Sequence, residues 1–124
     1  AFCMSGGVDS NSLISIAKRV FNHDVHGFTI LNEDERYEES DLVAHMVKEL
    51  GIRHTGVSIT SQQLLVNLRE LVRYHDAPVY TISYYVHWQL MSRIAAEGYR
   101  ISISGTAADE LLTGYYDHHK LYLL

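Results

Sequence analysis

The hydrophobic positions of this chain alternate between short continuous runs and stripes at helical spacing. Apolar runs typical of buried strands cover residues 1–4, 25–31, 52–59 and 100–104. Between them, apolar residues recur with helical periodicity, which predicts helices over 10–21, 41–50, 61–72 and 81–97, with one or two helical turns from 109. This alternation of strands and helices is the order of a parallel α/β sheet.

We therefore predict one α/β domain over residues 1–124, an open parallel sheet with helices on both faces. Open parallel sheets bind ligands beyond the carboxyl ends of their strands. Two loops rich in small residues, after Met4 and after Ser104, fall at such ends. A ligand site is expected where these two loops meet.

Local signals set the expected limits of several elements. Ser40 or Asp41 is expected to cap the second helix, and Gly51 to end it. Residues 32–39 are polar and acidic, which favours a solvated loop. Four aromatic residues recur near helical spacing and are expected to serve in packing rather than as a base-stacking platform: Tyr80, Tyr84, Tyr85 and Trp88.

The composition and charge of the chain argue against several classes of protein. The net charge of −5 argues against a nucleic-acid partner. No apolar run reaches the ~18 residues of a membrane span, so no membrane partner is expected. The single cysteine, Cys3, cannot form an internal disulfide, and a reducing, cytoplasmic location fits best. The chain starts inside an apolar run and stops on another, 121–124, so we expect a fragment of a longer protein.

The first small-residue loop reads Ser-Gly-Gly-Val-Asp-Ser, residues 5–10. Gly6 and Gly7 allow a ligand to approach the backbone closely. The helix that follows directs its free N–H groups and positive dipole end at the loop, which favours an anion. The lysine of a Walker A loop is missing, and so is the spacing of a dinucleotide loop. The alternative is a plain strand-to-helix turn capped by Asp9 or Ser10.

The full string resembles the pyrophosphate loop of the PP-loop ATP pyrophosphatases, which cleave ATP between the α and β phosphates. The second loop, Ser104 to Tyr115, resembles the S-G-x-G-x-D-E-hydrophobic-hydrophobic-x-G-Y motif of the asparagine synthetase family, in its C-terminal synthetase domain. Shorter stretches between the loops also match that family: Phe28-Thr29-Ile30, Tyr37-Glu38-Glu39, Asp76-Ala77-Pro78 and Leu90-Met91-Ser92-Arg93. The resemblance spans nearly the whole chain.

This resemblance implies the PP-loop (adenine nucleotide alpha hydrolase-like) fold and an ATP-dependent, amide-forming synthetase domain. The acceptor would be a small molecule with a carboxylate, and ammonia would come from an N-terminal glutaminase domain of the same chain. ATP would be bound by Cys3, Ser5, Gly6, Gly7, Asp9, Ser10, Ile30, Ser104 and Gly105. Main-chain groups of Cys3, Ile30 and Gly105 would line the adenine. Asp9 and Asp109 would hold Mg²⁺. The sequence is also compatible with a homodimer.

Electrostatics independently favours the metal. Two carboxylates beside a polyphosphate repel it and each other, by about 4 kcal/mol per pair at ~4 Å and an effective dielectric near 20. Mg²⁺ removes this repulsion and is normally held by one or two carboxylates, phosphates and water. The alternative is that Asp9 and Asp109 both cap helices.

The second loop departs from the family pattern. Thr106 stands where an acidic residue or tyrosine assists the chemistry, and a threonine hydroxyl is a poor general base. Ala107 and Ala108 replace the usual small residues, of which the first is glycine. No catalytic residue is assigned, although the loop with Asp109 and Glu110 is nearest the chemistry. An unusual acceptor is expected; the alternatives are another PP-loop activity (tRNA thiolation, GMP or NAD synthesis) or a nucleotide-binding module without catalysis.

Overall fold

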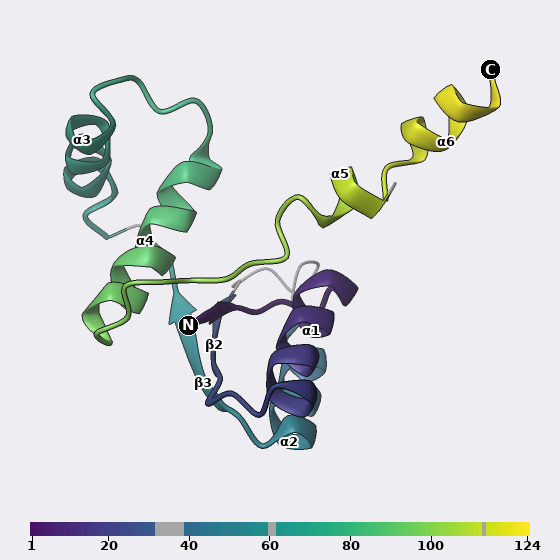
Figure 1. The fold of residues 1–124 in the computed structure, drawn as a ribbon. Coiled ribbons are helices and arrows are strands. Elements are labelled where there is room, and N and C mark those ends of the chain that lie inside the picture. Colours follow the sequence, from purple (N-terminus) through teal and green to yellow (C-terminus); the bar gives the residue numbers. More distant parts are fainter. Residues whose placement is uncertain (32–38, 60–61, 113) are drawn as a thin grey trace.

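The computed structural model describes residues 1–31, 39–59, 62–112 and 114–124. Its sheet contains three parallel strands in the order β1 (Phe2–Cys3), β2 (His26–Leu31) and β3 (Arg53–Ser58) (Figure 1). Cys3 lies opposite Phe28 in the β1–β2 pair. The predicted open parallel sheet is therefore confirmed. Most of the predicted acidic loop, the predicted helix start at Ser61 and position 113 of the second motif lie outside the described residues.

The helices follow the predicted order. They are α1 (Val8–Ser15) with the π-helical turn η1 (Ile16–Val20), α2 (Ser40–Leu50), α3 (Leu64–His75), α4 (Ile82–Ala96), α5 (Ala108–Leu112) and α6 (Tyr116–Leu123). Gly51 ends α2 as predicted, in the left-handed conformation with φ +59°. The predicted cap of α2 is wrong, because Glu39 takes the N-cap position and Ser40 and Asp41 already lie inside the helix.

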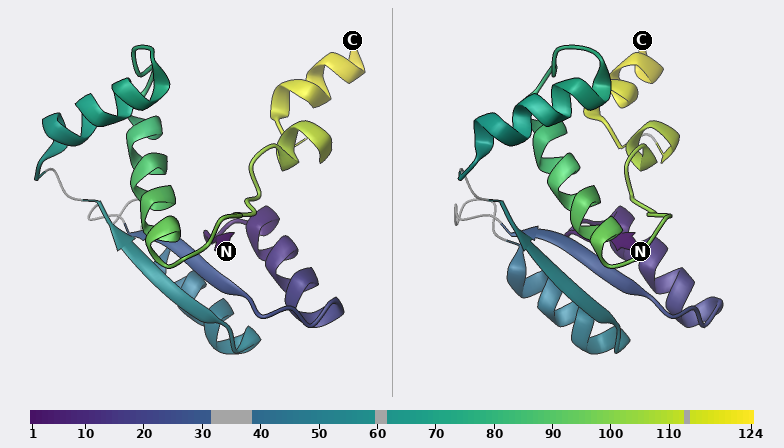
Figure 2. Two further views of the ribbon diagram at one scale, coloured as in Figure 1. Left: turned by 60° about the vertical axis from the view of Figure 1, so that its left-hand side comes forward. Right: turned by 90° about the vertical axis from the view of Figure 1, so that its left-hand side faces the viewer.

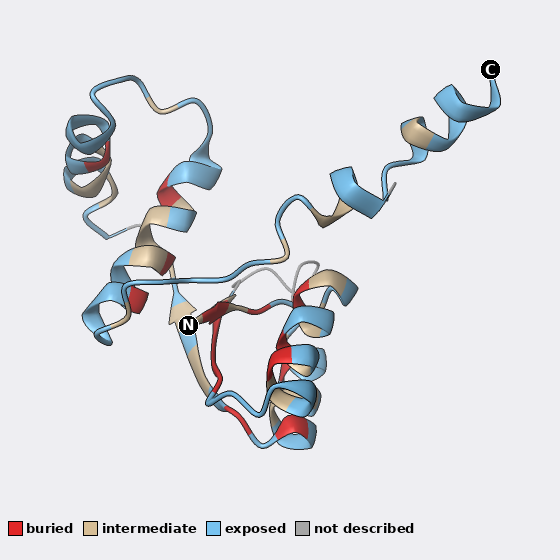
Figure 3. Cartoon of the chain, viewed as in Figure 1, coloured by how far each residue is buried: buried red, intermediate tan, exposed pale blue. Residues whose placement is uncertain are grey.

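Helices cover both faces of the sheet, as Figure 2 shows. Successive side chains of a strand point to opposite faces, so Phe2 and Met4 face α1 and α2 while Cys3 faces α4. The larger core lies on the α1/α2 side and contains Phe2, Met4, Ile14, Ala17, Val25, Val43, Leu50 and Ile52. The smaller core joins Phe28 of β2 to Leu90 and Ile94 of α4. Figure 3 shows these buried residues on the inner faces of the elements.

The predicted strand over 100–104 is reduced to one bridge, in which Ile103 pairs with Phe2 in parallel. The Cys3 N–H donates to the Ile103 carbonyl at 2.8 Å, and the Ile103 N–H donates to the Ala1 carbonyl at 3.0 Å. Ile101 and Ile103 expose their side chains, so no hydrophobic burial stabilises a longer strand at residues 100–104. The bridge still holds the start of the second loop beside the end of β1.

The aromatic residues of α4 divide between core and surface. Tyr85 is buried, with 2% of its surface exposed, and Trp88 is half-buried. Tyr84 is 48% exposed and packs edge-on against the His75 ring. Tyr80 is 89% exposed, so the packing prediction is wrong for this residue. The helices α5 and α6 extend away from the sheet, and their described side chains are largely exposed (Figures 1 and 3).

No helix within the described ranges is long and apolar enough to cross a membrane.

Candidate functional site

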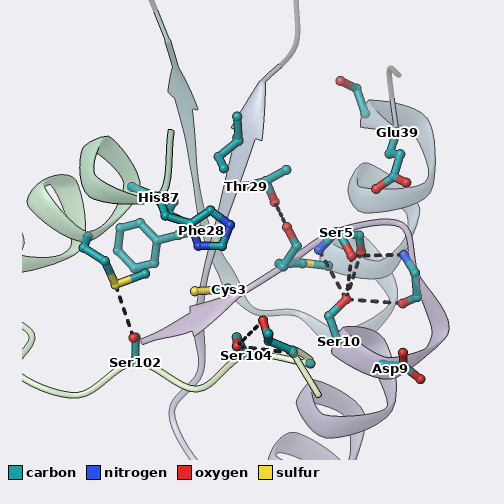
Figure 4. Close-up of a pocket in the computed structure, with 18 residues that line it drawn as sticks. Cys3, Ser5, Asp9, Ser10, Phe28, Thr29, Glu39, His87, Ser102 and Ser104 are labelled. Atoms are coloured by element: carbon teal, nitrogen blue, oxygen red, sulfur yellow. Dashed lines mark hydrogen bonds between the residues drawn. The ribbon is translucent and has the colours of Figure 1, made fainter. Parts of the chain in front are cut away.

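A cavity of about 600 Å³ opens at the carboxyl ends of β1 and β2, between the start of α1 and α4 (Figure 4). This volume lies within the range of roughly 300–1,000 Å³ typical of small-molecule sites. Most of the predicted ATP-binding residues line it: Cys3, Ser5, Gly7, Asp9, Ser10, Ile30, Ser104 and Gly105. Gly6 belongs to the same loop but is not among the lining residues. The fold thus brings both predicted loops to one cavity.

The first loop is held in shape by its own polar groups. Ser10 is buried, and its hydroxyl lies 2.9 Å from the Ser5 hydroxyl and accepts the Ser5 N–H at 3.3 Å. The Asn11 side-chain amide donates to the carbonyls of Ser5 at 3.1 Å and Gly7 at 2.9 Å. These contacts fix the loop carbonyls toward α1. Sequence reasoning missed Asn11, although it follows the motif directly.

The start of α1 is arranged to receive an anion. Gly7 occupies the N-cap position with extended backbone, and none of the described side chains caps this helix. The expectation that Asp9 or Ser10 would cap the helix in a plain turn is wrong, because both residues lie inside α1. Uncapped N–H groups and the helix dipole together favour negative charge at this end. Asp9 lies in the first turn and lines the cavity, which places a carboxylate at its rim.

A carboxylate already contacts the backbone of the first loop. The Gly6 N–H donates to Glu39 Oε2 at 2.6 Å, and Glu39 also lines the cavity from the N-terminus of α2. This short bond to a charged acceptor is of the strong kind that phosphate oxygens also form. The Gly6 amide is thus directed at an anion within the folded chain. Sequence reasoning placed Glu39 only within a family resemblance and did not foresee this contact.

Gly105 is the point at which the two loops touch. A Cβ atom at Gly105 would lie 2.8 Å from the Ser10 backbone nitrogen and 3.0 Å from Asp9 Cβ, closer than side-chain atoms normally approach. Only glycine therefore lets the second loop reach the start of α1 without a shift. Beyond it, the Ser104 hydroxyl donates to the Thr106 hydroxyl at 2.9 Å, and Thr106 lines the cavity.

Ala107 adopts the left-handed conformation, with φ +74°. This conformation costs an alanine about 1–2 kcal/mol and costs glycine almost nothing. The family pattern has glycine at this position, and the backbone geometry gives the physical reason. The second loop of this chain thus holds an alanine in a conformation that suits glycine better.

The acidic residues of α5 occupy a different setting from Asp9. Asp109 is not among the residues that line the cavity, and a side chain at Gly114 would overlap its carboxylate. Glu110 accepts a hydrogen bond from the Tyr115 hydroxyl at 3.0 Å, which raises the pKa of Tyr115. No cluster of three or more metal-ligating side chains exists among the described residues. Two carboxylates with phosphate and water remain sufficient for Mg²⁺, so the Asp9–Asp109 pair stays a prediction.

The opposite wall of the cavity is apolar. Phe28, Leu90 and Met91 line it together with Cys3. Burial raises the pKa of the Cys3 thiol, which favours its protonated form. An apolar wall opposite a polar loop suits a flat base attached to phosphates. The helical stripe of α4 was visible in the sequence, but not which strand end it would cover.

These features define an α/β domain with a glycine-containing loop between its first strand and first helix, beside a cavity at the carboxyl ends of the strands. The family model for asparagine synthase matches residues 1–124, and the chain belongs to this family. The family consists of ATP-dependent ligases.

Curated relatives agree with this placement. A provisionally named glutamine-hydrolysing asparagine synthetase of Mycobacterium tuberculosis (strain ATCC 25618 / H37Rv) is 31% identical over 112 residues, 90% of this chain. The glutamine-hydrolysing asparagine synthetase 1 of Bacillus subtilis (strain 168) is 27% identical over 112 residues. The match spans 17% of the length of each relative.

Among solved structures, the chain is similar to a predicted subunit of a tRNA methyltransferase from Methanocaldococcus jannaschii DSM. The two share 25% sequence identity with a TM-score of 0.49, over 85% of this chain and 51% of that chain. A likeness of this extent does not bear on the activity.

Proposed function

We propose that this chain forms the ATP-dependent synthetase domain of a glutamine-hydrolysing amidotransferase similar to asparagine synthetase. The observation that carries the proposal is the contact of Gly105 with Asp9 and Ser10, which joins the two family loops over one cavity. Family membership over the whole chain supports it. A glutaminase domain would lie N-terminal to this domain in the same longer, cytoplasmic protein and would supply ammonia.

The proposed reaction has two displacements. A carboxylate oxygen of the acceptor attacks the α-phosphorus of ATP, and the bond to the β-phosphate breaks and releases pyrophosphate. Ammonia then attacks the acyl carbon of the adenylate, AMP leaves with the bonding electrons, and the nitrogen loses a proton to give the amide. Both steps move negative charge onto phosphate oxygens, so catalysis consists mainly of positioning and charge neutralisation.

The first loop would bind the leaving pyrophosphate. The donors of this loop are the hydroxyls of Ser5 and Ser10, which lie 2.9 Å apart, and the backbone N–H groups of Gly6 and Gly7. The Gly7 N–H donates to the Ser5 hydroxyl at 3.2 Å, so it would exchange this partner for a phosphate oxygen. Since the Gly6 N–H already donates to the Glu39 carboxylate, the nucleotide would displace this carboxylate when it binds. Adenine would lie against the apolar wall, beside the main chain of Cys3, Ile30 and Gly105, with Ser104 in the same site.

Mg²⁺ would be held by Asp9 and Asp109 together with phosphate oxygens. Asp9 fits this role because it lines the cavity beside the first loop. Asp109 follows the contact at Gly105 in the first turn of α5. When bound, Mg²⁺ would neutralise the polyphosphate and favour departure of pyrophosphate.

The test is pyrophosphate release by the full-length protein with Mg²⁺, ATP, glutamine and a panel of carboxylic acids. We expect Asp9→Asn to lower kcat/KM for ATP by at least about 100-fold, the scale of losing a charge-stabilising group at a reacting phosphate. The matched control is Asp41→Asn, which removes an exposed carboxylate of α2 outside the cavity and should leave the rate unchanged.

Two results would count against the proposal. Unchanged Mg-ATP binding and turnover in Asp9→Asn would show that the site is assigned wrongly. Tight binding of ATP with no pyrophosphate release for any acid would identify a nucleotide-binding module without catalysis.

A further inference from the structure

The peptide that leads into the first loop, between Met4 and Ser5, is held at both ends. Its carbonyl oxygen, on Met4, accepts a hydrogen bond from the Thr29 hydroxyl at 2.9 Å (Figure 4). Its N–H, on Ser5, donates to the Ser10 hydroxyl at 3.3 Å. Two bonds at opposite ends fix the plane of this peptide. They therefore also fix the direction in which the Ser5 side chain leaves the backbone.

The Thr29 hydroxyl acts at the point where the chain leaves the sheet. Met4 follows Cys3, the last residue of β1, and its N–H still donates to the Phe28 carbonyl of β2 at 2.8 Å. Met4 and Thr29 are both buried. A buried carbonyl without a partner is costly, and the Thr29 hydroxyl supplies that partner from a side chain. The backbone can thus turn out of the sheet into the loop with this carbonyl satisfied.

A histidine of β3 continues the line of hydrogen bonds. His54 Nε2 lies 3.0 Å from Thr29 Oγ1. Because the single hydroxyl proton of Thr29 goes to the Met4 carbonyl, the hydroxyl oxygen accepts and His54 donates from Nε2. Burial, and to a smaller extent His26, lowers the pKa of His54, which favours the neutral ring. The line therefore runs from β3 across β2 to the entrance of the first loop.

The opposite face of the same two strands carries a second histidine–threonine pair, which leads to Tyr99. His26 Nε2 lies 2.9 Å from Thr55 Oγ1, and His26 Nδ1 lies 3.0 Å from the Tyr99 hydroxyl. The His26 ring packs against Phe28, with centroids 4.3 Å apart. Thr29 lines the proposed nucleotide cavity, whereas His26, Thr55 and Tyr99 do not. The two pairs share their chemistry and differ in their connection to the loop.

We infer that Thr29 and His54 are positioning residues for the proposed pyrophosphate site. They hold the Met4–Ser5 peptide so that the Ser5 hydroxyl is in place before the nucleotide binds, and His54 acts through Thr29. A loop shaped in advance loses less entropy when it binds an anion. The inference rests on the proposed function, because that function gives the first loop its ligand.

The test is calorimetric titration of the full-length protein and its variants with pyrophosphate and with Mg-ATP. Thr29→Val keeps the branched shape of the side chain and removes the hydroxyl. We expect it to raise Kd for both ligands about tenfold, the scale of one lost hydrogen bond. Thr29→Ser keeps the hydroxyl and should stay within about threefold of the wild type. The matched control is Thr55→Val, which removes the hydroxyl beside His26 and should change neither Kd.

Variants of His54 test whether this residue acts through Thr29. His54→Leu removes the donor and should raise both Kd values about threefold to tenfold. His54→Gln can place an amide N–H near the position of Nε2 and should restore most of the affinity. The double variant Thr29→Val/His54→Leu should bind no more weakly than Thr29→Val, because the two residues belong to one line of hydrogen bonds. If Thr29→Val does not fold, His54→Leu and His54→Gln carry the test.

The outcomes separate this inference from the proposed function. If Thr29→Val binds as the wild type does, or loses no more affinity than Thr55→Val, the inference is overturned and the proposed function stands. Additive losses in the double variant overturn the role of His54. If the wild-type protein binds neither pyrophosphate nor Mg-ATP, the inference and the proposed function fall together. A loss in Thr29→Val that Thr29→Ser restores and Thr55→Val does not share supports the inference.

Discussion

The two loops that line the nucleotide cavity are built in different ways. The first loop, residues 5–10, leaves a strand paired with β2 and enters an eight-residue helix, and it is braced by Ser10 and Asn11. The second loop, residues 104–114, follows a single bridge and enters a five-residue helix with no buried residue among those described. It also carries an alanine in the left-handed conformation.

This difference indicates that the two loops have different roles. The first loop has its shape before any ligand arrives, which lowers the entropy lost on binding an anion. The second loop depends on its contact with the first, through Gly105 against Asp9 and Ser10. We therefore expect the nucleotide subsite to be robust and the acceptor side to be adaptable. Three substitutions test this comparison.

The largest effect is expected from Gly105→Ala. Its new methyl group would meet the Ser10 backbone at 2.8 Å, so one loop must move away from the other. We expect Kd for Mg-ATP to rise about 100-fold in calorimetric titration of the full-length protein, the cost of misplaced binding groups. The matched change in the first loop is Gly7→Ala, whose Cβ would meet only the Ser5 hydroxyl at 3.2 Å and should weaken binding about ten times less.

Equal losses in Gly105→Ala and Gly7→Ala would contradict the comparison. They would mean that both glycines serve the close approach of the ligand and that the contact between the loops is unimportant.

An intermediate effect of opposite sign is expected from Glu39→Gln. The neutral side chain keeps a hydrogen-bond acceptor for the Gly6 N–H, now at 2.6 Å from Glu39, but removes the charge that a phosphate must displace. We expect Kd for Mg-ATP and for pyrophosphate alone to fall about threefold to tenfold, since charged acceptors bind such amides more strongly than neutral ones. Glu70→Gln, an exposed carboxylate of α3, is the control. Weaker pyrophosphate binding in Glu39→Gln would assign Glu39 to ligand binding instead of competition.

The smallest effect is expected from Ala107→Gly. Glycine relieves the left-handed strain at φ +74°, so the second loop should gain about 1 kcal/mol, detectable as slower hydrogen exchange across residues 104–112. Ala108→Gly makes the same chemical change at the first residue of α5, where no positive φ is relieved and glycine only adds conformational freedom, and should speed the exchange. Changes of the same sign in both variants would show that backbone strain does not govern this loop.

Much of the fold could be predicted because burial and periodicity are local properties. The strands β2 and β3 and the helices α2 and α4 lie within a few residues of their predicted ranges. The wrong predictions have a common cause: whether a side chain is buried depends on which other elements pack against it, and these are distant in sequence. Residues 100–104 have a strand-like pattern but only one bridge, and Tyr80 fits the aromatic spacing yet is 89% exposed.

The sequence by itself determined the family and the two loops, because glycine, serine and aspartate at fixed spacing meet local backbone requirements. It also determined that the loops follow strands of one parallel sheet, which places them at the same edge. Only the tertiary structure decided which groups meet there: Gly105 against Ser10, Glu39 on the Gly6 amide, and α4 along the apolar wall of the cavity. These contacts join residues distant in sequence, and no local pattern encodes the distance between them.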